Sequence, residues 1–262
     1  MRNSKVFFVT CSICFILTIP AVHCDLSYSV PEEVKQNHVI GNFAKDLGLE
    51  LRTISTRKAR LDFDGTKQFC DINLTTGDLI ASERIDREAL CDNKASCVLK
   101  ADLMMENPLE LHRVSLNVQD VNDNSPTFKN NLMEIEIRES TEKGSRFSLE
   151  EAHDADFGQN GVQRYILQKN ENFILSPDND KVELLLENKL DREKQKNMNL
   201  TLTAYDGGSP QRSGTVVIHI TVLDANDNAP VFSKGVYKAS LLENAPLGTV
   251  VVKVSATDAD EG

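Results

Sequence analysis

The stretch DVNDNSP, from Asp120 to Pro126, returns as DANDNAP from Asp224 to Pro230, 104 residues later. A tight turn needs only one or two Asp, Asn or Pro residues. Four oxygen-bearing side chains followed by a proline therefore indicate a further task. Because the spacing matches the length of one small domain, the two stretches predict a repeated unit and mark its boundaries.

Other marks recur in the same order along the chain. IDRE (Ile85–Glu88) returns as LDRE (Leu190–Glu193), and HDADFGQNG (His153–Gly161) returns as TDADEG (Thr257–Gly262). A glutamate also stands near the start of each unit, at Glu32, Glu139 and Glu243. The order Glu, DRE, DxNDNxP, DAD is kept from unit to unit, which unrelated short motifs would not do.

Between these marks, apolar and polar residues alternate with period two, the pattern of half-buried strands. The apolar faces are Val114, Leu116 and Val118; Met133, Ile135 and Ile137; and Val216, Ile218, Ile220 and Val222. Only NFAKDLGLEL (Asn42–Leu51) suggests a short helical turn. About seven short strands in roughly 100 residues predict an all-β fold of tandem Greek-key β-sandwich repeats.

The marks divide the chain into four parts. We expect a signal peptide at 1–24, a first repeat at 25–122, a second at 123–226 with its linker at 120–126, and the start of a third at 227–262. Because the third is cut off after its first strands, we expect the sequence to be a fragment of a longer protein.

The N-terminus predicts export. Arg2 and Lys5 precede the apolar run Val6–Val22, and a cleavage point follows near Cys24, as in secretory signal peptides. The alternative, an uncleaved anchor, asks for a somewhat longer run. No later segment is predicted to cross a bilayer. The chain has a net charge of −11, which argues against a nucleic-acid partner or an anionic membrane surface.

Export allows disulfides. Cys91 and Cys97 close a small loop, where a bridge stabilises by roughly 2 kcal/mol in the loop-entropy view. Cys70 is then left over, and we expect it to be a small buried apolar residue rather than an intermolecular link. The sequons at Asn73 and Asn199 are candidate glycosylation sites in the same compartment.

The acidic motifs gather at the joints between repeats, and they offer the oxygen donors that a hard cation needs. Ca²⁺ takes 6–8 oxygens from carboxylates, Asn side chains and backbone carbonyls. The predicted ligands of the first joint are Glu32, Asp86, Glu88, Asp120, Val121, Asn122, Asp123, Asn124, Asp154, Asp156, Asn160 and Asp206. Those of the second are Glu139, Asp191, Glu193, Asp224, Ala225, Asn226, Asp227, Asn228, Asp258 and Asp260. Val121, Asn124 and Asn160 are expected to act through carbonyls.

Other chemistries fit less well. An EF-hand loop needs Gly at position 6 and Glu at position 12, where the first stretch has Ser125 and Asn131. A catalytic carboxylate pair should occur once, whereas these motifs occur at every joint. Solvated acidic turns explain one DxNDN but not the ordered set. The sequence has no GxSxG, P-loop or GxGxxG motif, and no enzyme is expected.

The motifs PE, LDRE, DxNDNxP and DAD, in this order, resemble those of cadherins over all of residues 25–262. The finer resemblance is to clustered protocadherins, carried by YSVPEE (Tyr28–Glu33), VIGNFAKDLGLEL (Val39–Leu51), TGDLIASERIDREALC (Thr76–Cys91) and AYDGGSPQRSGT (Ala204–Thr215). CDNKASC (Cys91–Cys97) resembles the short disulfide loop of their first repeat. The chain has no Trp, so it lacks the anchor used by cadherins that exchange an N-terminal strand.

The resemblance implies a type I neuronal cell-membrane protein with its repeats outside the cell and about three Ca²⁺ per complete joint. It implies homophilic, calcium-dependent adhesion, with an identical molecule on the apposed cell in trans and neighbours on the same cell in cis. The membrane anchor is expected only in the intact protein. A soluble cadherin fragment that binds another protein or blocks adhesion is the alternative, and a secreted hydrolase is a remote third.

Overall fold

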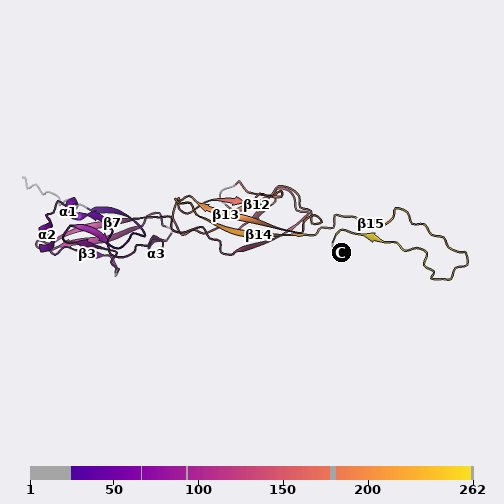
Figure 1. Ribbon diagram of the computed structural model, residues 1–262, viewed down its shortest axis with the longest axis horizontal. Coiled ribbons are helices and arrows are strands. Elements are labelled where there is room, and N and C mark those ends of the chain that lie inside the picture. Colours follow the sequence, from indigo (N-terminus) through magenta and orange to yellow (C-terminus); the bar gives the residue numbers. More distant parts are fainter. Residues whose placement is uncertain (1–24, 66, 93, 178–180, 261–262) are drawn as a thin grey trace, which may run out of the picture. The chain divides into compact units, whose positions relative to one another are not determined.

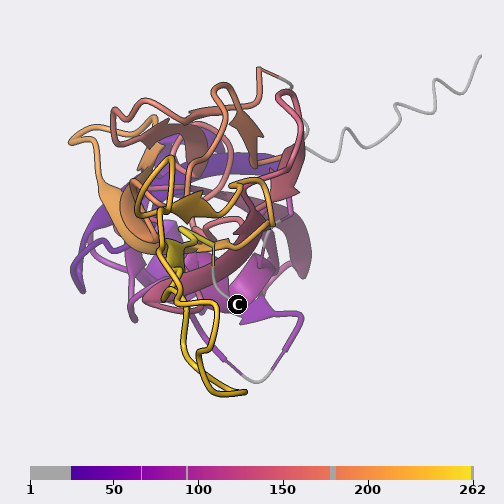
Figure 2. The same ribbon diagram turned by 90° about the vertical axis from the view of Figure 1, so that its right-hand side faces the viewer.

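The computed structural model describes residues 25–65, 67–92, 94–177 and 181–260. The predicted signal peptide lies outside these residues. The chain forms two compact units. The first holds the described residues up to Ile85 together with Val98–Val118, and the second holds Asp86–Cys97 and the described residues from Gln119 onward. Figures 1 and 2 show the strands of both units from two directions.

The first unit contains two sheets. One has the strand order β1-β7-β6-β3 and the other the order β2-β5-β4. Its elements are β1 (Leu26–Pro31), β2 (Val39–Asn42), α1 (Phe43–Asp46), α2 (Leu51–Thr56), β3 (Arg60–Phe63), β4 (Cys70–Asn73), β5 (Asp78–Ala81), β6 (Val98–Met105) and β7 (Glu110–Gln119). The predicted alternation is confirmed on β7, where Val114, Leu116 and Val118 are buried. The expected helical turn is α1, which Asn42 caps by accepting a hydrogen bond from the Lys45 amide at 2.8 Å.

The second unit begins with the short helix α3 (Arg87–Cys91) and contains two larger sheets and one strand pair. The sheets have the orders β10-β13-β14-β8 and β11-β12-β9, and β15 pairs with β16. The strands are β8 (Leu132–Arg138), β9 (Arg146–Ser148), β10 (Val162–Leu167), β11 (Phe173–Leu175), β12 (Glu183–Leu186), β13 (Asn197–Asp206), β14 (Ser213–Leu223), β15 (Val231–Phe232) and β16 (Ala256–Thr257).

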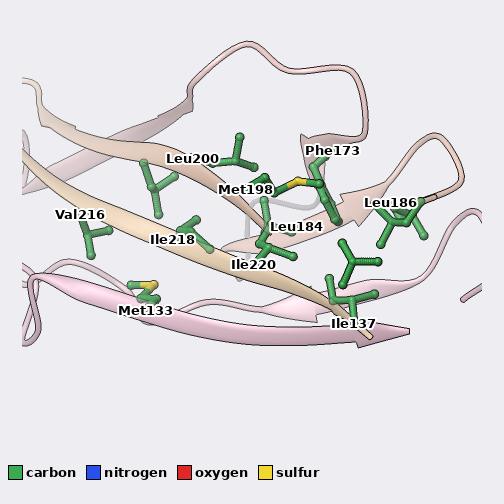
Figure 3. Close-up of a cluster of buried hydrophobic side chains, with 13 residues drawn as sticks. Met133, Ile137, Phe173, Leu184, Leu186, Met198, Leu200, Val216, Ile218 and Ile220 are labelled. Atoms are coloured by element: carbon green, nitrogen blue, oxygen red, sulfur yellow. The ribbon is translucent and has the colours of Figure 1, made fainter. Parts of the chain in front are cut away.

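The core of the second unit lies between its two larger sheets. In Figure 3, Ile218 and Ile220 of β14 and Met133 of β8 point toward Leu184 and Phe173 of the opposite layer. β14 pairs with β8 in parallel, with Ile218 opposite Met133, so the buried faces of the two strands are in register. The period-two pattern is confirmed on both strands, and the fold is the predicted β-sandwich.

The second residue of β14 is a glycine, Gly214, for a steric reason. A Cβ at Gly214 would lie 1.9 Å from the Pro126 carbonyl oxygen, so only glycine lets the linker pass this close. The proline that ends DVNDNSP is therefore packed directly against the sheet of the second unit.

Cys70 is the free cysteine of the described residues, and it is buried, as predicted. Burial raises the pKa of its thiol to about 12, so the group is a neutral core side chain at physiological pH. Among the described residues, no helix is both apolar and long enough to span a bilayer.

Candidate metal centre

The DRE segment forms α3, a helix that the strand pattern did not predict. Asp86 caps it, since its Oδ1 accepts a hydrogen bond from the Ala89 amide at 2.8 Å. The signal was available: an N-capping Asp precedes Arg, Glu, Ala and Leu, which are strong helix formers. The Cys91–Cys97 disulfide is present and follows directly on the helix. α3 thus fixes where Glu88 points.

Glu88, Asp123 and Asp156 come together although they lie far apart in the sequence. One carboxylate oxygen from each lies within 4.8 Å of the others. Asn124 arranges two of them: its amide donates to Asp156 Oδ2 at 3.0 Å, and its Nδ2 donates to Asp156 Oδ1 and to Asp123 Oδ1, both at 2.7 Å. Three carboxylates this close repel one another, and nearby positive charge favours their charged forms over protonation.

Three buried oxygens nearby have no hydrogen-bond partner within the described chain. They belong to Asn122 (Oδ1), Asp154 (Oδ2) and Asp206 (Oδ2). Leaving a buried acceptor unsatisfied costs roughly 1–3 kcal/mol, and more for a charged one. An oxygen-binding cation satisfies such atoms, so these three are the strongest structural sign of a ligand.

The other atoms of these side chains are held in place. Asp206 is fully buried (0% exposed), and its Oδ1 accepts hydrogen bonds from the Gly208 amide at 3.3 Å and the Arg212 amide at 2.8 Å. Asn122 donates its Nδ2 to the Pro210 carbonyl at 2.6 Å and lies where a Cβ at Gly208 would be, 2.2 Å away. The DGGSP loop therefore holds Asn122 through its Nδ2 and Asp206 through its Oδ1, and it leaves Asn122 Oδ1 and Asp206 Oδ2 without a hydrogen-bond partner in the described chain.

The charge state of Asp154 reflects this crowding. Its pKa is raised, chiefly because burial disfavours the charged form and further because the carboxylates of Asp156 and Asp206 are close. Its Oδ1 accepts the Asp156 amide at 3.2 Å. The Asp206 carboxylate is thus close enough to Asp154 to raise its pKa.

Asp120 closes this cluster from the linker. Its Oδ1 accepts the Phe157 amide at 3.0 Å, and its Oδ2 accepts the Asn160 side-chain amide at 2.8 Å. Asn160, expected to offer a carbonyl, thus also acts through its side chain as a donor. Glu32 is buried in the first unit, just after β1.

The second set of motifs repeats the same local bonds. Asn228 donates its amide to Asp260 Oδ2 at 2.9 Å, and its Nδ2 donates to Asp260 Oδ1 at 2.7 Å and to Asp227 Oδ1 at 2.9 Å. The Asp260 amide donates to Asp258 Oδ1 at 3.2 Å. These bonds match those of Asn124, Asp123, Asp156 and Asp154 one for one. The two motifs therefore fold alike.

Two overlapping groups of carboxylates form here. Glu139, Glu193 and Asp227 offer oxygens within 4.8 Å of one another, and so do Glu193, Asp224 and Asp260. Glu139 is buried and accepts the Arg192 amide and the Ala225 amide, both at 2.8 Å. The pKa of Asp227 is raised by loss of hydration and by these neighbouring acids, whereas hydrogen bonds from Asn228 lower the pKa of Asp260.

Some predicted residues have other contacts. Asp191 pairs with Lys194 at 2.5 Å, which lowers the pKa of the Asp191 carboxyl. The Val121 carbonyl accepts the Asp123 amide at 2.7 Å. The ligand roles of all the predicted residues remain predictions, including those of Val121, Asn124, Ala225, Asn226 and Asn228. Asn199 is exposed on β13 and Asn73 is partly exposed at the end of β4, and both remain candidate glycan sites.

The donor set decides which ion fits. The side chains in the acidic groups offer carboxylate and amide oxygens, and within the described residues these groups include no cysteine or histidine. Oxygen-only sets suit Ca²⁺ or Mg²⁺ rather than zinc or copper.

Sequence reasoning missed two residues here: Arg87 and Arg192, the middle residues of the DRE motifs, are buried among these acids.

Comparison with known proteins finds cadherin family models and protocadherin relatives. Two family models match, one described as cadherin-like over residues 25–107 and one as cadherin domain over residues 133–223. Human protocadherin gamma-C3 is 46% identical over 242 residues, which is 90% of this chain and 26% of that protein. Human protocadherin gamma-B2 is 47% identical over 247 residues, which is 92% of this chain and 26% of that protein. The chain thus spans about a quarter of the length of these curated relatives.

Solved structures agree with the sequence relatives. The structure of mouse clustered PcdhgC3 EC1-3 matches with a TM-score of 0.84 and 45% identity, covering 90% of this chain and 77% of that one. Protocadherin gamma C5 EC1-3 matches with a TM-score of 0.85 and 44% identity, covering 91% of this chain and 78% of that one. The likeness extends over most of the compared length in both.

Proposed function

The chain belongs to the clustered protocadherins of the cadherin family, and from this premise we propose that it binds calcium at its acidic motifs and acts in homophilic cell–cell adhesion. The family is one of adhesion proteins, and its cadherin domains bind calcium where repeats join. The division into repeats at 25–122, 123–226 and 227–262 belongs to this proposal, as does placement outside the cell membrane of a neuron.

The observation that carries the calcium proposal is the set of unpartnered buried oxygens on Asn122, Asp154 and Asp206. Asp120, Asp123 and Asp156 with Glu88 are proposed for the first ligand set, and Glu32 and Asp86 are included from their places in the sequence. Glu139, Glu193, Asp224, Asp227, Asp258 and Asp260 are proposed for the second. When bound, calcium supplies the positive charge and the six to eight coordination positions that these oxygens need.

Other residues of the chain orient the proposed ligands through hydrogen bonds. Gly208 and Arg212 hold one oxygen of Asp206 and leave the other for a ligand. Asn124 and Asn228 orient the carboxylates of their clusters in the same way. These hydrogen bonds hold the acidic segments against the β-sandwich of the second unit.

Calcium binding is tested by isothermal titration of the whole chain, first stripped of metal. We expect saturable binding of calcium that magnesium does not match, because Mg²⁺ demands a tighter octahedral set. Heat signals equal to those of buffer alone would overturn the proposal.

Adhesion is tested with a chimera, because the chain covers a quarter of its relatives. This chain replaces the matching N-terminal part of human protocadherin gamma-C3, and cells display the product. We expect aggregation in millimolar calcium, none in chelator, and segregation from cells that carry unaltered gamma-C3. Mixed aggregates would argue against self-recognition by this chain, and the absence of any aggregates against adhesion.

A further inference from the structure

Two buried arginines lie among the acidic motifs without belonging to either proposed ligand set. The exposed fraction is 2% for Arg87 and 3% for Arg192. An arginine cannot lose its charge in a protein, and burying it costs free energy unless carboxylates or carbonyls compensate. Each therefore has to be explained by its neighbours.

Arg87 contacts all three acidic motifs of its cluster. Its Nη1 lies 3.2 Å from Asp120 Oδ1 and 4.0 Å from Glu88 Oε1. Its guanidinium stacks over the ring of Phe157, with 4.9 Å to the centroid, just after the DAD motif. Its Nη2 also donates to the Lys94 carbonyl at 2.6 Å. One cation thus links DRE, DxNDN and the DAD loop.

Arg192 does the same 105 residues later. Its Nε lies 2.5 Å from Asp224 Oδ1, and its Nη2 lies 3.0 Å from Glu193 Oε1. Its Nη2 also donates to the Ala259 carbonyl, inside the second DAD motif, at 3.3 Å. The same three motifs are joined by the same residue type, so the arrangement is a property of the repeated unit.

We propose that Arg87 and Arg192 are internal counter-cations that hold the acidic motifs together when calcium is absent and that moderate calcium affinity when it is present. This inference rests on the proposed calcium binding. Asp120 and Asp224 are proposed ligands, and each already faces a fixed positive charge. In the calcium-free protein the arginine offsets repulsion among the carboxylates, whereas beside a bound divalent ion its charge opposes binding. Both are positioning residues rather than ligands.

Arg57 provides a matched control. It is also buried, at 8% exposed, and its Nη1 forms an ion pair with Glu110 Oε2 at 3.0 Å. Its Nε donates to the Glu106 carbonyl at 3.1 Å and its Nη2 to the Pro108 carbonyl at 2.6 Å. It lies in the first unit and contacts none of the acidic motifs. Its loss should lower stability by the same amount with and without calcium.

The experiment compares melting temperatures of the whole chain in chelator and in millimolar calcium for wild type, Arg87→Gln, Arg87→Lys, Arg192→Gln and Arg57→Gln. In chelator we expect Arg87→Gln to lower the melting temperature by roughly 5–10 °C, the range for a broken buried ion pair. In calcium the loss should be less than half as large. The calcium-dependent gain therefore grows. Arg87→Lys keeps the charge and should fall between wild type and Arg87→Gln.

Calorimetric titration adds a second readout. Arg87→Gln should bind calcium at least as tightly as wild type. Equal losses in both buffers, a smaller calcium gain or binding weakened more than threefold would each overturn the inference while leaving calcium binding intact. If wild type itself gains nothing from calcium, the proposed function fails and this inference with it. An Arg87→Gln variant that folds only in calcium supports the inference. If Arg87→Gln folds in neither buffer, Arg87→Lys takes its place, and its rise in melting temperature on adding calcium must exceed that of wild type.

Discussion

Asp206 uses its two oxygens for different purposes. Oδ1 fixes the DGGSP loop through two backbone amides, and Oδ2 is buried without a partner in the described chain. Asparagine keeps one acceptor for the loop but removes the negative charge. Substituting this one residue can therefore weaken ion binding while leaving the support of the loop in place.

The first prediction follows from this division. Asp206→Asn should weaken calcium binding by at least roughly tenfold, because affinity depends on the number of charged ligands, while the melting temperature in chelator stays the same or rises. Calorimetric titration measures the first and thermal unfolding the second. Glu187→Gln, an exposed acid in the same unit, is the control and should change neither. Unaltered affinity in Asp206→Asn would remove Asp206 from the ligand set.

The second prediction concerns protons at Asp154. Its pKa is raised, so as pH falls this carboxyl takes up a proton before an ordinary Asp, whose pKa is about 3.9. A bound cation needs the carboxylate, so calcium binding should displace the proton from Asp154 and weaken as pH falls through the raised pKa of this carboxyl. Titration in buffers of different ionisation enthalpy measures the proton count. Asp154→Asn should abolish this release, and an unchanged count would contradict the assignment.

The third prediction concerns Glu110 and Arg57. The hydrogen bond from Arg57 lowers the pKa of Glu110, so the charged form stabilises the fold above the unfolded pKa, about 4.3, and this stabilisation is lost as pH falls through the depressed folded pKa. Glu110 is 41% exposed, so solvent screening keeps the effect to roughly 1 kcal/mol or less. Glu110→Gln should be less stable than wild type at pH 7, and this difference in stability should vanish once pH falls below the depressed pKa of Glu110, measured by urea unfolding.

At the scale of elements, the strand pattern predicts the sheets, whereas the helix α3 follows only from its capping Asp86 and the helix formers after it. Period two placed Ile218 and Met133 on one buried face, because a sheet covered on one side allows no other register. α3 is only five residues long, too short for a hydrophobic period to show, and its acidic residue Glu88 also fits a metal-ligand pattern. Sequence also gave the acids of the site but could not show that Asp191 pairs with Lys194, or that Arg87 and Arg192 are buried, since both depend on three-dimensional packing.

The fourth prediction uses the two faces of β14. Ile218→Ala should lower the free energy of unfolding of the second unit by about 2–5 kcal/mol, because it opens a cavity in a fully buried site. Val217→Ala, one residue away on the outer face and 37% exposed, should cost well under 1 kcal/mol. Urea unfolding measures the free energy of unfolding of both variants. Equal losses of stability would mean that the assignment of Ile218 to the buried face is wrong.

At the scale of the whole molecule, the chain has stable sheets and acidic segments whose order depends on charge balance. The sheets bury continuous apolar cores, whereas the acidic segments depend on ions and arginines. Removing calcium should therefore affect the two kinds of structure unequally.

The fifth prediction is that chelation speeds amide hydrogen exchange in 120–126 and 154–160 by roughly tenfold or more while β13 and β14 change little. Mass spectrometry of peptides from the whole chain measures both regions at once. Uniform acceleration across the chain would indicate that calcium stabilises the entire fold, and no acceleration anywhere that the acidic segments are ordered without it.

The buried thiol of Cys70 has a practical consequence. Thiolate, not thiol, attacks alkylating reagents, and this group is covered by the first unit with a pKa of about 12. Labelling can then proceed only when the unit opens. The rate of alkylation at Cys70 therefore reports how often the first unit unfolds, and mass spectrometry can follow it without an introduced probe.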